Sequence, residues 1–245
     1  MSGRPLHVVT YNIHKGFSQF KRQMMVHELR ERLRELSPDL VFLQEVQGRH
    51  NRHATVIEDW PTEPQYAFLA DGFWPSAAYG RNAIYDHGHH GNAILSRYPI
   101  AHAHNQDVTH LRFERRGLLH CVIDVPGFAQ ALHCVCVHLS LFARSRRRQM
   151  DALSVYLEAI APPEAPLIVA GDFNDWGAQI TRMLWGFGLY EFDAPRAFTF
   201  PARLPLVQLD HVYVRGLEPI GLQVPRGRIW WRMSDHLPLI AEFRV

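Results

Sequence analysis

Short apolar runs alternate with segments of helical periodicity along the whole chain. The runs are rich in Val, Leu and Ile, a pattern typical of strands. They cover residues 6–13, 39–46, 92–96, 117–125, 130–139, 166–173, 209–214 and 236–245. The spacing of other apolar residues predicts two clear helices, over about 22–36 and 144–160, and a shorter one over 178–186.

The balance of strands and helices predicts how the elements are layered. Two clear helices among so many strands cannot cover a large parallel sheet on both faces, so we expect an α/β (α+β) sandwich of two mixed β-sheets with helices outside. No linker rich in Gly, Ser or Pro divides the chain, which favours a single domain over residues 1–245. The segments VVTYNI and IVAGDFN look alike, and each is an apolar strand followed by an Asn. We therefore expect two similar halves that bring their strand ends to one rim.

Composition narrows the partners and the compartment. The formal net charge of +2 produces no strong field for nucleic acid, although a pI of 8.5 and local arginines leave room for an anionic substrate. The chain start lacks the long apolar core of a signal peptide, and no stretch approaches the ~18 apolar residues of a membrane helix. Cys121, Cys134 and Cys136 lie in strand-like segments, which favours reduced core thiols. We expect a cytoplasmic protein and a monomer.

Polar groups follow several of the apolar strands. Rigid strands aim the groups at their ends, and the adjoining loops leave room for a substrate. Taken singly, each has an ordinary explanation, such as a satisfied core carboxylate or an Asx turn. Capping does not require so many of them, and together they indicate a site. The groups are Asn12, Glu45, His138, Asp172, Asn174 and Asp210, with Asp235 and His236 just before the last strand.

Two other metal sites compete for these residues. An EF-hand loop starting at Asp172 is excluded, because its fifth and twelfth positions would be Trp176 and Met183 and the bidentate carboxylate is missing. Zinc is an alternative for CVCVH, which contains Cys134, Cys136 and His138, or for the loop with His87, His89 and His90, but neither has zinc-finger spacing. We interpret the histidine loop as a polar rim.

The motifs TYNIH, FLQEV, GNAILSRYPI, CVHLS, AGDFND, LDHVYV and SDHLPL occur in this order. Together they resemble the serial motifs of the endonuclease/exonuclease/phosphatase superfamily, which includes pancreatic-type deoxyribonucleases, abasic-site endonucleases, neutral sphingomyelinases and inositol polyphosphate 5-phosphatases. The resemblance spans residues 7 to 243 and is closest to the bacterial YbhP-like branch. It implies a DNase I-like fold, a four-layer α-β-β-α sandwich.

The resemblance also implies a role for each motif residue. Glu45 would be the main Mg²⁺ ligand, with Asn12 and Asp235 nearby, and Mn²⁺ could substitute. Asp172 would position or deprotonate the attacking water, Asn174 and His236 would hold phosphate oxygens, Asp210 would pair with His236, and His138 would lie beside the leaving group. Asn92 is a further expected substrate contact. The glutamate that partners this histidine in deoxyribonucleases has no evident match. Asp175 is expected to be a turn residue and Trp176 a packing residue.

The sequence leaves the substrate open. The ARSRRRQ segment places Arg144 at a helix start, where we expect it to contact an anionic substrate. Trp74, Tyr79, Tyr85, Trp230 and Trp231 either stack on bases or touch a lipid surface, or belong to the core. The favoured function is a Mg²⁺-dependent phosphodiesterase or phosphatase acting on a phospholipid or small phosphodiester, with peripheral membrane contact allowed. The alternatives are an abasic-site or nonspecific DNA endonuclease, and a catalytically inactive binding module of the same fold.

Overall fold

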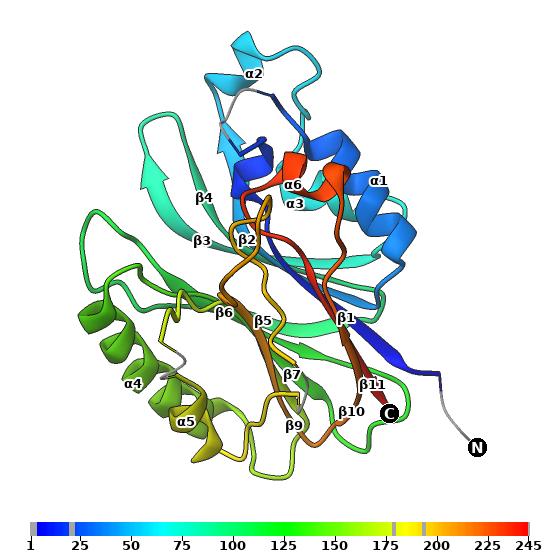
Figure 1. The fold of residues 1–245 in the computed structure, drawn as a ribbon, viewed down its shortest axis with the longest axis vertical. Coiled ribbons are helices and arrows are strands. Elements are labelled where there is room, and N and C mark those ends of the chain that lie inside the picture. The colour runs from blue at the N-terminus through cyan, green and yellow to red at the C-terminus, as the bar shows by residue number, and fades with distance from the viewer. Residues whose placement is uncertain (1–3, 20–22, 178–179, 193–194, 245) are drawn as a thin grey trace.

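The computed structural model describes residues 4–19, 23–177, 180–192 and 195–244, and it contains two mixed β-sheets packed face to face with helices on both outer faces (Figure 1). This is the predicted four-layer sandwich. The first sheet has the order β10 (Glu218–Gln223), β11 (Leu239–Arg244), β1 (Leu6–Asn12), β2 (Leu40–His50), β4 (Gly88–Ser96) and β3 (Ser76–Tyr85). The second has the order β5 (Ile100–Asp107), β6 (Gly117–Ile123), β7 (Leu132–His138), β8 (Leu167–Asp172) and β9 (Asp210–Arg215).

Each sheet is built around one parallel pair of strands, β1 with β2 and β7 with β8, and the other pairs are antiparallel. The carboxyl ends of β1 and β8 meet across the sandwich, where the Asn12 amide donates a hydrogen bond of 3.0 Å to Asp172. The likeness between VVTYNI and IVAGDFN therefore corresponds to two equivalent strands that end at one rim.

Three layers of apolar side chains hold the sandwich together. The inner layer lies between the sheets and contains residues such as Phe42, Ile94 and Ile168. The outer face of the first sheet is covered by α1 (Val26–Leu36), α3 (Gln65–Ala70) and α6 (Arg228–Met233), and that of the second sheet by α4 (Ala143–Ile160) and α5 (Ile180–Trp185) (Figure 1). Because the central strands are buried on both faces, they consist of nearly continuous apolar runs.

The strands that periodicity did not predict are β3, β5 and β10, which all lie at sheet edges. An edge strand has one side open to solvent and carries polar residues, as in IAHAHNQD of β5, so its apolar signal is weak. The short helices α2 (His53–Val56), α3 and α6 and the 3₁₀ turn His14–Gly16 were not predicted either. The first two residues of the predicted helix 178–186 lie outside the described residues.

The structure decides between alternatives for several residues. Cys121, Cys134 and Cys136 are free and buried, and no group of three metal-ligating side chains in the described ranges includes a cysteine, so the zinc alternative for CVCVH is wrong. Trp74 and Trp230 belong to the core rather than to a ligand surface, because they are 2% and 7% exposed. In the described ranges, no helix is both long enough and apolar enough to cross a membrane.

Candidate active site

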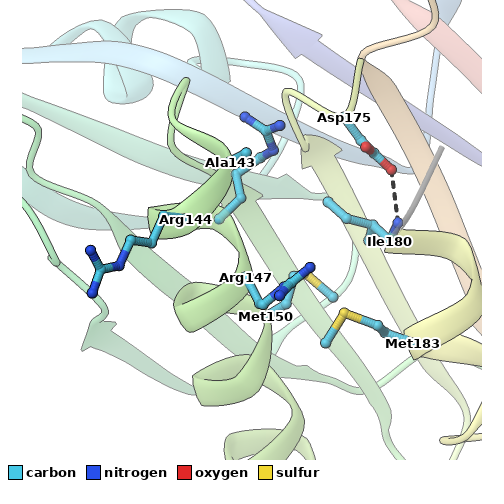
Figure 2. Close-up of a pocket in the computed structure, with 8 residues that line it drawn as sticks. Ala143, Arg144, Arg147, Met150, Asp175, Ile180 and Met183 are labelled. Carbon is cyan, nitrogen blue, oxygen red and sulfur yellow. Dashed lines mark hydrogen bonds between the residues drawn. The ribbon is translucent and has the colours of Figure 1, made fainter. Parts of the chain in front are cut away.

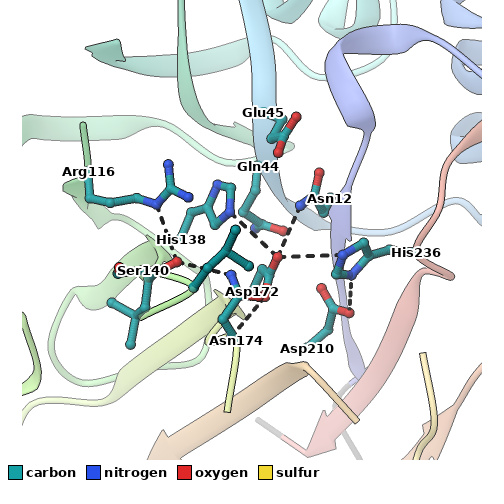
Figure 3. A network of polar contacts seen from close by, with 12 residues as sticks. Asn12, Gln44, Glu45, Arg116, His138, Ser140, Asp172, Asn174, Asp210 and His236 are labelled. Atoms are coloured by element: carbon teal, nitrogen blue, oxygen red, sulfur yellow. Dashed lines mark hydrogen bonds and ion pairs between the residues drawn. The ribbon is translucent and has the colours of Figure 1, made fainter. Parts of the chain in front are cut away.

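The polar groups that follow the strands come together at one rim of the sandwich (Figure 3). Asn12, His138 and Asp172 are the last residues of β1, β7 and β8, and Asp210 is the first residue of β9, opposite Asp172 in register. Parallel pairing of β7 with β8 places His138 beside Asp172. The sheet topology therefore assembles a site from residues that are far apart in the sequence.

Asp172 is the centre of the polar network. One carboxylate oxygen accepts a hydrogen bond from the Asn12 amide at 3.0 Å, and the other accepts one from the Asn174 backbone N–H at 2.9 Å. The Nε2 atoms of His138 and His236 each lie 3.6 Å from the first oxygen. Burial raises the pKa of Asp172 to about 6, although the charge of His236 and the hydrogen bond from Asn12 oppose the rise. Asp172 is thus a carboxylate that can take up a proton near neutral pH.

His236 is the positive group of the network. Its Nδ1 lies 2.8 Å from Asp210, which also accepts a hydrogen bond of 2.6 Å from the Thr199 hydroxyl. Burial alone would lower the pKa of His236, but the charges of Asp210 and Asp172 outweigh it and raise the pKa to about 10. The ring is therefore protonated at neutral pH, with one N–H bound to Asp210 and the other directed at Asp172.

His138, unlike His236, is uncharged. It is buried, and desolvation together with the positive charge of Arg116 holds its pKa well below the usual value. Arg116 donates to the Leu139 carbonyl at 3.2 Å and pairs with Glu114 at 3.1 Å. Glu114 binds the Ser140 hydroxyl and the Leu141 N–H, and no hydrogen bond joins a glutamate to His138 among the residues described. A neutral imidazole therefore faces Asp172.

Glu45 reaches the rim through an irregularity in β2. The pairing of β2 with β4 shifts register between Leu43 and Val46, and Glu45 has a φ of +55°. A bulge of this kind turns a side chain away from the face that the strand would give it. Asn174, with a φ of +50°, has the same left-handed conformation. Such residues cost about 1–3 kcal/mol each and cluster at functional sites.

Glu45 and Asp235 are acidic and partly exposed, and two basic residues of the turn after β1 face them. The Lys15 ammonium lies 3.5 Å from Glu45, and the His14 ring lies 3.3 Å from Asp235. Burial would raise the pKa of both carboxyl groups, but Lys15 lowers that of Glu45, and the hydrogen bond from His14 lowers that of Asp235 to about 2. Both groups are therefore ionised at neutral pH.

Two sets of residues could hold a metal ion. Asp172, Asp210 and His236 have ligand atoms within 4.8 Å of one another. However, His236 is protonated and hydrogen-bonded to Asp210, so it offers no lone pair. The second set is Glu45 and Asp235 with the side-chain oxygen of Asn12, which also accepts the His14 N–H at 3.1 Å. This set supplies only oxygen ligands at a partly open position, which suits Mg²⁺.

Other predicted residues lie around this centre. Asp175 accepts hydrogen bonds from Gly177 and Ile180 and is a turn residue as expected, whereas the expectation for Trp176 is wrong, because 55% of it is exposed. Asn92 is buried, and its amide bridges the sheets by donating to the carbonyls of Gly117 and Cys136 at 3.1 and 3.2 Å. These hydrogen bonds do not support binding of the substrate by Asn92, which stays a prediction.

Arg144 lies exposed at the start of α4, where it lines a pocket between α4 and α5 (Figure 2). In the same segment, Arg146 donates to the carbonyls of Ser140 and Leu141, and Arg148 binds His110. No hydrogen bond or ion pair occupies the Arg144 guanidinium within the described part of the chain. It remains available for an anion.

Sequence patterns missed Arg116, Thr199, His14 and Lys15. Arg116 lies in a loop-like FERRG segment, and Thr199 in a loop without regular structure. The sequence around neither residue has the periodicity of a helix or strand. Arg116 lies near His138, and Thr199 binds Asp210, only because the loops pack together. His14 is the last residue of the TYNIH motif and Lys15 follows it, so their closeness to Asn12 in the sequence was the one available signal.

A two-sheet sandwich with a buried carboxylate and histidine network at its shared rim defines the DNase I-like class of proteins. The chain belongs to the endonuclease/exonuclease/phosphatase family, whose model matches residues 9–236. Members of this family are generally hydrolases that act on phosphate esters. The chain is 44% identical to the uncharacterized protein YbhP of Escherichia coli (strain K12) over 243 residues, which cover 97% of this chain and 96% of that protein.

Solved structures share the fold at low sequence identity. An endonuclease/exonuclease/phosphatase from Beutenbergia cavernae superposes with a TM-score of 0.76 at 21% identity, covering 99% of this chain and 72% of that one. TDP2 of D. rerio, complexed with single-strand DNA product, superposes with a TM-score of 0.67 at 16% identity, covering 99% and 100% of the two chains. These likenesses show the fold alone.

Proposed function

We propose that the protein is a divalent-metal-dependent phosphoric ester hydrolase, using Mg²⁺ or in its place Mn²⁺, that cleaves a small or lipid phosphodiester by attack of water. The observation that supports this most is the hydrogen-bond network of Asp172. A buried carboxylate with a pKa raised to about 6 lies between a protonated and a neutral histidine, beside a pair of ionised acids. This arrangement has a base, a cationic anion-binding group and an oxygen-rich metal site.

The residues then divide the work of hydrolysis. Asp172 accepts a proton from water while the water oxygen bonds to phosphorus and the ester P–O bond breaks. His236, kept protonated by Asp210, binds a non-bridging phosphate oxygen together with the Asn174 amide. The N–H of His138 donates a hydrogen bond to the leaving oxygen. That oxygen takes its proton from solvent. Glu45, Asp235 and Asn12 would hold a Mg²⁺ ion, which neutralises phosphate charge when bound.

The charge distribution favours a small or lipid ester over a long nucleic acid. A protein that binds along a duplex neutralises several phosphates. Here the net charge is +2, and in the arginine-rich start of α4 both Arg146 and Arg148 are already hydrogen-bonded. The fold shared with TDP2 keeps a DNA endonuclease as the second candidate. The inactive binding module is disfavoured, because every predicted catalytic group lies at the one rim.

The cellular setting remains an expectation. Three buried free cysteines are compatible with a reducing compartment such as the cytoplasm. We also expect a monomer and peripheral contact with a membrane.

A substrate panel tests the proposal. The purified protein with Mg²⁺ or Mn²⁺ would be assayed against bis-p-nitrophenyl phosphate, p-nitrophenyl phosphate, phospholipids, plasmid and abasic DNA. We expect turnover of a small or lipid diester that EDTA abolishes and that Asp172→Asn lowers by about 10²-fold or more. Plasmid nicking at nanomolar protein without turnover of small or lipid esters would favour the nuclease instead. Lack of turnover of every ester would refute the proposal.

A further inference from the structure

A cavity of about 610 Å³ opens beside Glu45, and none of the groups assigned to catalysis lines it. Lys15, which lies 3.5 Å from Glu45, and His90 form the part of its lining nearest to the catalytic centre. His90 pairs with Gln47 of β2, two residues beyond Glu45. The cavity then extends along the end of β2 to α2 and the β3–β4 hairpin. A group attached to a phosphate at Glu45 could enter it directly.

Half of the residues that line the cavity carry an aromatic ring. Phe17, His50, His53, Tyr85 and His90 all line it. The rings of His50 and His53 are stacked, and the ring centroid of Tyr85 lies 5.8 Å from those of both His50 and His90. Burial lowers the pKa of His53 and of His90 to about 4, so both rings are neutral at physiological pH. Neutral aromatic faces favour a flat, aromatic ligand.

The charged side chains that line the cavity favour one class of aromatic ligand over another. The lining includes two cationic side chains, Lys15 and Arg52, but no carboxylate. Cations repel a quaternary ammonium group, which aromatic walls would otherwise attract. They attract a phosphate, and Lys15 is the one next to the catalytic centre. The combination suits a planar base that is joined to a phosphate.

The wall beside Glu45 is fixed by the fold. His14, Lys15 and Gly16 have φ values of +46°, +59° and +74°, and a side chain at Gly16 would meet the Gln65 amide at 2.5 Å. Gln65 in turn donates to the Lys15 carbonyl at 2.9 Å and accepts the Gln47 N–H at 2.8 Å. Because α3 ties the turn to β2, the entrance is already formed before a ligand binds.

From this geometry we infer that the cavity holds the nucleoside of the substrate, so that the protein hydrolyses esters of nucleoside monophosphates. The inference rests on the proposed function. The ester bond to the other alcohol breaks, the water oxygen joins phosphorus, and Asp172 takes the water proton. The other alcohol takes a proton from solvent and leaves beside His138, and a nucleoside monophosphate remains on the side of Lys15.

Two chromogenic diesters test it, thymidine 5′-(p-nitrophenyl phosphate) and methyl p-nitrophenyl phosphate. They share the leaving group and differ only in the nucleoside. We expect the nucleotide ester to have a kcat/KM about tenfold or more above that of the methyl ester. Tyr85→Ala should lower this ratio by about fivefold or more, whereas Tyr85→Phe, which keeps the ring and loses only the 2.7 Å hydrogen bond from Gln47, should retain it. Trp185→Ala, at an exposed ring on α5, is the control that leaves both rates unchanged.

Binding of thymidine 5′-monophosphate, measured by calorimetry, separates the two proposals. If neither ester is cleaved but the nucleotide binds wild type and Tyr85→Phe more tightly than Tyr85→Ala, the cavity assignment stands and the proposed function fails. If both esters are cleaved at the same rate, or a phospholipid is preferred, the assignment of a nucleoside is overturned while hydrolysis stands. A melting temperature within a few degrees of wild type confirms that each variant is folded.

Discussion

The Nδ1 atom of His236 lies 2.8 Å from a carboxylate oxygen of Asp210, and both side chains are buried. This contact determines the charge of the site, because it keeps a histidine protonated where burial alone would keep it neutral. Among the described residues, His138, on the other side of Asp172, pairs with no carboxylate besides that of Asp172, and it is neutral. One buried carboxylate thus faces two imidazoles, of which one is protonated and the other neutral.

The first prediction concerns the titration of His236. Its folded-state pKa is raised to about 10, above the unfolded value of about 6.5. The stability that the pair contributes is therefore fully present below pH 6.5 and is lost as the pH rises through the folded pKa. An NMR titration should show the ring protonated through pH 8, and Asp210→Asn should lower the pKa. Titration of the wild-type ring below about pH 6 would contradict the pairing.

The second prediction concerns the metal. Glu45→Gln keeps the shape of the side chain and removes a charge from an all-oxygen site, so Mg²⁺ affinity and activity should fall together. Calorimetry of Mg²⁺ binding and the diester assay measure the two effects. Glu28→Gln, on the helix α1, is a matched control that changes an acid away from the site. Normal Mg²⁺ binding and turnover in Glu45→Gln would show that Glu45 is not a ligand.

The third prediction concerns the backbone at Glu45. Its φ of +55° is unfavourable for a residue with a side chain and favourable for glycine. Glu45→Gly should therefore abolish activity while the free energy of unfolding rises by about 0.5–1 kcal/mol or stays level. Urea denaturation measures this, with Glu242→Gly as the comparison at a β11 position whose φ is not positive. A clear loss of stability in Glu45→Gly would show that the backbone strain is absent.

The fourth prediction concerns Arg144. A contact with a remote part of the substrate binds the ground and transition states alike, so Arg144→Ala should raise KM more than it lowers kcat. Arg148→Ala removes a neighbouring arginine that is bound to His110 and is the matched control. If DNA were the true substrate, the salt dependence of its binding would have a slope near −0.9 per phosphate contacted. A steep slope together with efficient nicking would replace the small-ester preference.

The fifth prediction concerns stability in acid. His120 is buried on β6 with its Nε2 3.1 Å from His133, and burial lowers its pKa to about 4. The unfolded chain takes up a proton first as the pH falls through about 6.5, so stability declines from there and levels off near pH 4. His120→Leu should remove about 1–3 kcal/mol of this decline, as seen in urea unfolding from pH 7.5 to 4. His87→Gln, at an exposed ring, should leave the slope unchanged, and an equally steep slope in His120→Leu would exclude His120 as the cause.

The sequence by itself determined the layers of the fold and the chemical groups of the site. Central strands buried on both faces must be continuously apolar, and α4 must present an apolar stripe, so both could be predicted from the order of residues. Polar residues that end such strands are costly to bury, and for that reason Asp172 and Asn12 stood out. The resemblance to the family then assigned their roles, which stay predictions.

Only the tertiary structure decided how these groups are charged and aimed. The left-handed backbone of Glu45, the protonated state of His236 and the neutral state of His138 depend on contacts between residues far apart in the chain. Three of the edge strands, β3, β5 and β10, were missed because an edge needs no continuous apolar run. The turn 14–16 was missed because it has no period. The aromatic cavity joins the turn after β1, the end of β2 and the β3–β4 hairpin. Local periodicity carries no information about which loops pack together, so this cavity could come only from the folded chain.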